Sequence, residues 1–293
     1  MAPMNNRLLV PRKVPGLLDL VPGAAAAYSL RSLSNSYADP VVTVRRSSDD
    51  AEEDFTAAEV ADGTLAAFCG AGDGFVYRWW DQSGNANHAV AAADANEPQI
   101  VDSGVVITDE GFPAIRFDET PKYLNGGGVG LGDVFSVFLI YRTLSSSTSL
   151  DSLVNTYATF QSGLGAKGLQ MSESQSAFFV SSGTSTTLIR TDIDPYGFEN
   201  KTSLLSYVCD GPSGTTGVRL RRNGASAGAN TVTGGSTLNN IPHGDLTIGQ
   251  AEIYVPGNPE RALDGYMKEV IVYPSDLTAQ VALIEGNMAW AWS

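Results

Sequence analysis

The residues best able to do chemistry occur in one aromatic and polar segment, FVYRWWDQSGNANHAV. Asp81 and Asn85 supply oxygen atoms that could bind calcium or a sugar, and Trp79 or Trp80 could stack on a pyranose ring. In the alternative, the polar side chains bond their own turn, with Gly84 at positive φ, and the tryptophans fill the core. We favour this structural interpretation. Adjacent strand residues face opposite ways, so one tryptophan should be buried and the other nearer the surface.

A second group of carboxylates lies in the segment TDIDPYGFEN. Asp192 and Asp194 would share one side of an extended chain, with Glu199 close behind. Calcium takes six to eight oxygen ligands, so two carboxylates do not make a site by themselves. We therefore expect no cofactor and no metal, with calcium as the one ion that these loops could hold.

Other catalytic and metal-binding patterns are missing from the chain. No Ser-His-Asp arrangement surrounds either histidine, His88 or His243, and the two cysteines, Cys69 and Cys209, have no CxxC spacing. Both cysteines lie in apolar runs and should be buried free thiols. The glycine-rich stretch at 125–132 lacks the Lys-Ser/Thr of a phosphate-binding loop and is expected to form a flexible rim loop.

The charge balance disfavours a nucleic-acid partner. The chain has 18 Lys and Arg against 32 Asp and Glu, a formal charge of -14, which would repel a phosphate backbone. Arg219, Arg221 and Arg222 could form a small cationic patch with Lys201, suited to an acidic glycan or to an acidic neighbouring protein. In GVRLRRNG the first two arginines share one strand face, so an ordinary exposed strand face is the simpler interpretation.

The pattern of the remaining chain predicts a mainly β fold. Short β runs separated by glycine-rich turns follow one another from residue 99, with no long helix between them, which favours a sandwich over a parallel sheet. Helices are expected over 24–37, from Thr56 or Asp62, and from Ser275 or Asp276 to the end. The acidic stretch DDAEEDF is expected to be a solvated loop.

The first 23 residues differ from the rest. They contain four prolines and little periodicity, which predicts an extended arm ahead of a domain at 24–293. We expect the arm to attach the domain to other proteins or to copies of this chain. Its candidate contact residues are Arg7, Leu8, Leu9, Val10, Arg12 and Lys13. No apolar stretch reaches the ~20 residues of a membrane span, and no signal peptide is evident, so no membrane insertion is expected.

Several strings together resemble a known family. AAAAYSLRSL, LAAFCGAGDGFV, WWDQSGNANHA, AIRFD and GYMKEVIVYPSDLTAQVALIEGNMAWAW resemble concanavalin A-like (lectin or laminin-G-like) domains of bacteriophage structural proteins. The same outline is similar to the catalytic domain of fungal α-L-arabinofuranosidase B. The resemblance covers residues 24–292 and implies a concanavalin A-like jelly-roll sandwich with a few short helices.

The arabinofuranosidase resemblance also implies a reaction. Retaining glycosidases place a nucleophilic and an acid/base carboxylate about 5 Å apart. The family's nucleophile lies in a Tyr-Gly-Asn-Ala-Glu run, and the corresponding stretch here, LVNTYATFQSG at 153–163, contains no acid. The family's acid/base Asp follows Ile-Gly-Gly, whereas here Ile248, Gly249, Gln250 and Ala251 precede Glu252. We therefore expect no catalytic residues and no enzymatic activity.

These observations lead to one functional expectation. The chain is predicted to be a non-enzymatic bacteriophage virion protein, a capsid decoration or tail and fibre component assembled in the host cytoplasm. It would display a lectin-like domain that could bind cell-surface glycans. The alternatives are a glycoside hydrolase of the α-L-arabinofuranosidase type and a stand-alone carbohydrate-binding module.

Overall fold

The computed structural model describes most of the chain. The described parts are residues 15–118, 122–144, 152–157, 200–211, 218–226, 243–251 and 261–292, with the backbone of six further strands between residues 159 and 233. All six candidate contact residues of the predicted arm lie outside these parts. No helix in the described chain is long and apolar enough to cross a membrane.

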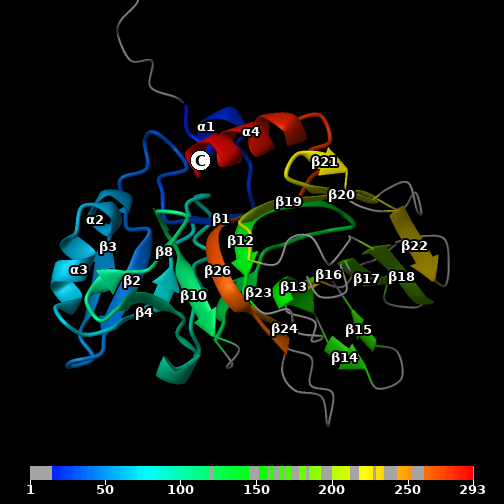
Figure 1. The fold of residues 1–293 in the computed structure, drawn as a ribbon. Helices are drawn as coiled ribbons and strands as arrows, with labels where there is room; N and C mark the ends of the chain where they lie inside the picture. The colour runs from blue at the N-terminus through cyan, green and yellow to red at the C-terminus, as the bar shows by residue number, and fades with distance from the viewer. Residues whose placement is uncertain are drawn as a thin grey trace, which may run out of the picture.

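The centre of the fold is an antiparallel sheet built on two ten-residue strands, β12 (Val134–Thr143) and β26 (Asp264–Tyr273). On one side, β12 pairs with β19 (Ser203–Asp210), which is followed by β20 (Val218–Arg222) and β21 (Ala225–Ser226). On the other, β26 pairs with β1 (Ala26–Ser29) and β10 (Ile115–Asp118). Figure 1 shows β12, β19 and β26 side by side beneath the C-terminal helix.

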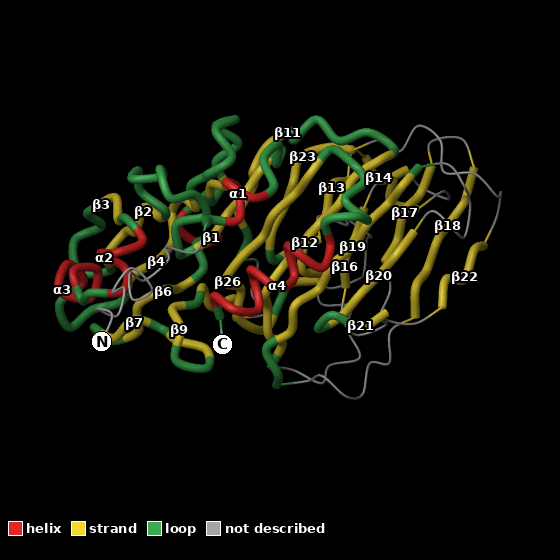
Figure 2. Tube along the Cα trace, turned by 90° about the horizontal axis from the view of Figure 1, so that it is seen from above, coloured by secondary structure: helices red, strands yellow, loops and turns green. Residues whose placement is uncertain are grey.

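A second layer of antiparallel strands lies against one face of the central sheet (Figure 2). Its order is β11 (Leu124–Gly128), β23 (His243–Ile248), β13 (Ser152–Tyr157), β16 (Leu169–Ser172), β17 (Phe178–Ser182), β18 (Ser185–Asp192) and β22 (Ala229–Thr233). Three short hairpins accompany the layers: β8 (Thr108–Asp109) with β9 (Phe112–Pro113), β14 (Thr159–Gln161) with β15 (Gly165–Lys167), and β24 (Gln250–Ala251) with β25 (Arg261–Ala262).

The N-terminal third adds a set of short strands and helices at one end. Its strands are β2 (Val42–Arg46), β3 (Glu52–Phe55), β4 (Gly74–Trp79), β5 (Ala89–Val90), β6 (Gln99–Asp102) and β7 (Val105–Val106). Its helices are α2 (Ala57–Ala61), α3 (Thr64–Cys69) and the 3-10 turn η2 (Asp94–Asn96). This set joins both layers, because β6 pairs with β10 and β5 pairs with β11.

Both faces of the central sheet are covered. On the inner face, Phe135 packs on Tyr207 and against the His243 ring of the second layer. On the outer face, Ser136 accepts a hydrogen bond from the Leu277 amide, at the approach to helix α4 (Val281–Ala291). Helix α4 lies over this face beside α1 (Leu17–Leu20) (Figure 1). Strands buried on both sides explain the continuous apolar run of β12.

The predicted fold class is confirmed, since the chain is mainly β and every described strand pairing is antiparallel. The strands expected at 134–143, 203–211, 217–224 and 263–274 appear within two residues of their predicted bounds. The C-terminal helix is also present, although its N-cap is Gln280. Both cysteines are buried free thiols, as expected.

Four local predictions are wrong. The alanine-rich stretch expected as a helix forms β1, because pairing with β26, in the register Ala26 with Val272, overrides the helix propensity of alanine. The acidic stretch expected as a loop forms β3, where Phe55 is buried and the charged side chains face solvent. Part of the glycine-rich stretch forms β11. Residues 17–20, inside the segment expected to be extended, form α1, with Leu17 buried.

A buried carboxylate joins the sheet to both ends of the described chain. Glu269 of β26 is fully buried and accepts hydrogen bonds from Ser29 Oγ (3.0 Å), Arg31 Nε (2.8 Å) and Trp292 Nε1 (2.9 Å). Arg31 also bonds Asn287 of α4, whose amide donates to the Pro15 carbonyl (3.3 Å). One charged group therefore connects β1, β26, α4 and the first described residue.

We expect Glu269→Ala to lower the free energy of unfolding by about 3 kcal/mol, because it leaves Arg31 and the Trp292 N–H without their acceptor. Urea denaturation followed by tryptophan fluorescence measures the change. The matched control is Asp49→Ala, which breaks the surface pair with Arg46 and should cost under about 1 kcal/mol. Equal losses in the two variants would show that the Glu269 network has no special role.

Candidate functional site

The Asp-Gln-Ser-Gly-Asn turn is bonded throughout to the protein itself. Asp81, only 4% exposed, accepts from the Ala27 amide (2.8 Å) and the Ser83 amide (2.9 Å) at Oδ1, and from Ser83 Oγ (2.7 Å) and the Asn87 amide (3.0 Å) at Oδ2. The Asn85 side chain donates to the carbonyls of residues 24 and 25. The turn therefore holds β1 in place through these hydrogen bonds. A ligand-binding role for Asp81 and Asn85 stays a prediction.

The two tryptophans occupy different environments, as expected, with Trp79 at the end of β4 and Trp80 directly after it. Trp79 is fully buried and packs against Tyr28, with ring centroids 5.8 Å apart. Trp80 is partly exposed and donates its indole N–H to Thr43 Oγ1 (2.9 Å). Its ring contacts His88 at 4.5 Å and the Arg78 guanidinium at 4.9 Å. A sugar would have to displace these contacts to stack on Trp80.

The other candidates from the sequence do not converge with this turn. Asp192 is the last residue of β18, but its side chain, like all of Asp194, lies outside the described part of the chain. Arg219 and Arg221 do share one face of β20. Arg222 is buried on the other face, where it donates to the Tyr141 hydroxyl.

The structure brings together two segments that are almost one hundred residues apart. These are β13 and the turn at 248–250. Val154 pairs with Ile248, and the Gly249 amide donates to the Leu153 carbonyl (2.9 Å). The Asn155 side-chain amide donates to the Gln250 carbonyl. We call this place the β13 junction.

The β13 junction is tightly built and polar. Gly249 has φ +90°, and a Cβ there would lie 2.3 Å from the Phe117 ring, so only glycine fits. Asn155 and Gln250 are 1% and 7% exposed, and Gln250 Oε1 is buried without a hydrogen-bond partner in the described structure. Such an unsatisfied acceptor is unfavourable unless a ligand or water supplies a donor. Glu252 lies outside the described residues.

His243 borders the β13 junction as a neutral ring. Its Nε2 lies 3.2 Å from the Gly132 carbonyl, which can only accept, so Nε2 carries the proton and Nδ1 accepts from Thr156 Oγ1 at 2.7 Å. Burial lowers the pKa of His243 to about 4, although Gly132 and Asp133 act in the opposite direction. At neutral pH the ring is therefore uncharged and hydrogen-bonds both the Gly132 carbonyl and the Thr156 hydroxyl.

One buried ionic cluster, centred on Asp109, is not predicted by any local pattern in the sequence. Asp109 bonds Arg142 Nη1 (2.8 Å), Lys268 Nζ (2.9 Å) and Thr202 Oγ1 (2.5 Å). Burial alone would raise the pKa of Asp109, but the hydrogen bonds from Thr202, Lys268 and Arg142 lower it overall. Four residues far apart in the chain meet here only through folding. No group of three or more His, Cys, Asp or Glu side chains suited to a metal occurs among the residues that are described.

Comparison with known proteins points to one class of enzyme. A family model described as "Alpha-L-arabinofuranosidase B, catalytic" matches residues 19–110. The similarity is to arabinofuranosidases. No curated protein matches the chain.

Two solved structures extend this similarity over most of the fold. An arabinofuranosidase complexed with arabinofuranosyl-α-1,2-xylobiose has a TM-score of 0.53 at 16% identity and covers 92% of this chain. A mutant GH54 α-L-arabinofuranosidase soaked with 4-nitrophenyl α-L-arabinofuranoside has a TM-score of 0.55 at 14% identity, also over 92%. This chain spans 62% and 63% of those two chains. At these identities the structural matches show a shared fold.

These findings correct the expectation of a non-enzymatic virion protein. The matched family model describes a catalytic domain and the two structures are arabinofuranosidases, so the similarity is to glycoside hydrolases of that type and not to virion proteins. None of these three matches is a bacteriophage lectin domain, a capsid decoration or a tail protein. The resemblance to arabinofuranosidase B is confirmed, and the resemblance to bacteriophage structural proteins receives no support.

The pKa of His243 predicts a pH dependence of stability. The folded pKa of about 4 lies below the usual 6.5, so the unfolded chain binds the proton more tightly between these values. His243 therefore gives its full stabilisation above pH 6.5 and loses it as the pH falls towards 4, by about 3 kcal/mol.

Urea titrations of the native protein and of His243→Gln at pH 7.0, 5.5 and 4.5 measure this effect. The gap in free energy of unfolding between the two proteins should shrink at low pH. Burial lowers the pKa of His88 as well, so the gap for His88→Gln should also shrink at low pH. A gap that stays constant with pH would contradict the assignment.

Proposed function

We propose that this chain is a glycoside hydrolase of the α-L-arabinofuranosidase type, with its sugar site at the β13 junction. The observation that carries the proposal is the match of residues 19–110 to the catalytic-domain model. The similarity of the whole fold to arabinofuranosidase structures adds support. The close approach of β13 to the turn at 248–250 provides a polar, preorganised place for the sugar.

Hydrolysis needs carboxylates near this place, because an amide neither transfers a proton nor acts as the nucleophile of such a reaction. Asn155 and Gln250 are suited to hydrogen bonds with sugar hydroxyls. Two carboxylates lie within a few residues of the turn at 248–250 in the sequence. Asp245 is exposed and shares a strand face with Thr247, the cross-strand partner of Asn155, and Glu252 follows Gln250 by two residues. We assign these two acids as the candidate catalytic pair.

A second candidate function is the binding of an arabinofuranosyl sugar without hydrolysis. The amide side chains of Asn155 and Gln250 favour it, since they occupy the two segments that carry carboxylates in the arabinofuranosidases. The unsatisfied Gln250 Oε1 would accept a hydrogen bond from a sugar hydroxyl. The two functions differ in turnover and share the same site.

The test uses 4-nitrophenyl α-L-arabinofuranoside as substrate. We expect the native chain to release 4-nitrophenol, and Asp245→Asn and Glu252→Gln each to lower kcat by about 10²–10⁴-fold, the usual effect of losing a general acid or base. The control is Glu53→Gln, which changes an exposed carboxylate of β3 and should leave kcat unchanged.

The outcomes separate the two functions. Release of 4-nitrophenol that depends on both acids supports the hydrolase. Saturable binding of methyl α-L-arabinofuranoside without hydrolysis, weakened by Gln250→Ala, supports the binding module and overturns the hydrolase. A chain that neither hydrolyses nor binds the sugar overturns both.

A further inference from the structure

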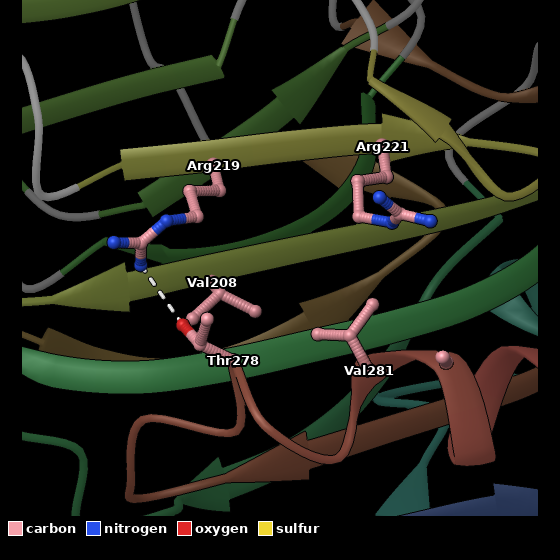
Figure 3. A pocket seen from close by; sticks show the side chains of 6 residues that line it. Val208, Arg219, Arg221, Thr278 and Val281 are labelled. Atoms are coloured by element: carbon pink, nitrogen blue, oxygen red, sulfur yellow. Dashed lines mark hydrogen bonds between the residues drawn. The ribbon is translucent and has the colours of Figure 1, made fainter.

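A separate hollow lies on the outer face of the central sheet, between β19, β20 and the first turn of α4 (Figure 3). Its volume is about 170 Å³, and its lining residues are Val208, Arg219, Arg221, Thr278, Val281 and Ala282. Pockets for drug-sized ligands have roughly 300–1,000 Å³, so this hollow suits one small ring at most. Neither the family match nor the β13 junction includes any of these residues.

The sheet register explains why two arginines face the hollow. Arg219 lies opposite Val208 and Arg221 lies opposite Ser206, so both side chains leave β20 on the face covered by α4. Ser206 Oγ and Arg221 Nε each bond Glu285 Oε1 at 2.8 Å, which fixes Arg221 against the helix. Figure 3 shows the Arg219 side chain reaching the Thr278 hydroxyl at the other end of the hollow.

Both guanidinium groups are held in place, and their contacts with the described residues leave N–H groups to offer. Arg219 bonds Thr278 Oγ1 (2.8 Å) and Asp210 Oδ2 (2.9 Å). Arg221 uses Nε and Nη2 on Glu285, and Nη2 also donates to the Gly224 carbonyl. A guanidinium has five N–H groups, so each arginine has more donors than these contacts use. Their fixed positions reduce the entropy cost of binding an acceptor.

The other lining groups limit the class of ligand. The Thr278 hydroxyl accepts from Arg219 and donates to Asp276 Oδ1 (2.6 Å), so its own proton is already used. Val208, Val281 and Ala282 provide apolar surface. The hollow therefore offers hydrogen-bond donors and apolar contact, which suits a ligand with an acceptor-rich head on a C–H-rich body.

We propose that this hollow binds the carboxylate of a uronic acid sugar. The carboxylate would accept N–H groups from Arg219 and Arg221, a charge-assisted geometry that guanidinium groups favour. The C–H face of the ring would pack on the valine and alanine side chains. Asp210 and Glu285 already balance the two arginines, so short-range hydrogen bonds and apolar contact provide the affinity, with little long-range attraction. The site lies on the outer face of the central sheet, away from the β13 junction, and does not depend on hydrolase activity.

Isothermal titration of the full chain with D-glucuronate tests the proposal. Ala282→Phe places a ring in the hollow from an exposed helix position and should weaken binding by at least about tenfold. Its matched control is Ala289→Phe, which changes an exposed alanine two turns later on α4 and should bind as the native chain does.

Arg219→Gln should also lower the affinity for D-glucuronate by about tenfold, because it removes a charge-assisted hydrogen bond. Its control is Arg46→Gln, a half-buried arginine of β2 that is also paired with a carboxylate.

Matched titrations with D-glucose and with acetate define the ligand class. Binding of glucuronate alone, lost in Ala282→Phe and retained in Ala289→Phe, supports the proposal. Equal binding of D-glucose or of acetate overturns it, because the head or the ring would then be unnecessary. Absence of glucuronate binding to the native chain, or full binding to Ala282→Phe, also overturns it. None of these results bears on the hydrolysis of an arabinofuranoside.

Discussion

The buried Glu269 carboxylate is the interaction on which the arrangement of the fold most depends. It lies in the middle of β26 and gathers donors from β1, from the loop after β1 and from the C-terminal end of the chain. A buried charge is unfavourable unless all of its oxygens are engaged, so the donors must sit in their observed places together. This requirement holds α4 and the first described residues on the outer face of the central sheet.

The covering of this face has two consequences for function. The outer surface between α4 and β20 becomes a bounded hollow with two anchored arginines. The inner face remains free to pack against the second layer, where β13 meets the turn at 248–250. The two candidate sites therefore occupy different layers of one sandwich, and the same strand system supports both. The Asp81 turn supports this indirectly, since it keeps β1 beside β26.

Short-range patterns predicted the strands best where burial on both faces leaves a long apolar run, as in β12 and β26. They failed at β1 and β3, where pairing with a distant strand outweighs local propensity. The similarity to arabinofuranosidase B also follows from the sequence, as does the absence of acids at 153–163. That led to the expectation of a protein without catalysis, which the family match contradicts.

The amino-acid sequence by itself determined the fold class, the buried free cysteines and the similarity to arabinofuranosidases, because alternation, turns and short motifs are local properties of the chain. Only the tertiary structure decided which distant residues meet. The Glu269 and Asp109 clusters, the contact of Asn155 with Gln250, and the hollow at Arg219 each combine residues separated by tens to hundreds of positions. Such contacts depend on strand register and layer packing, and no local pattern specifies either.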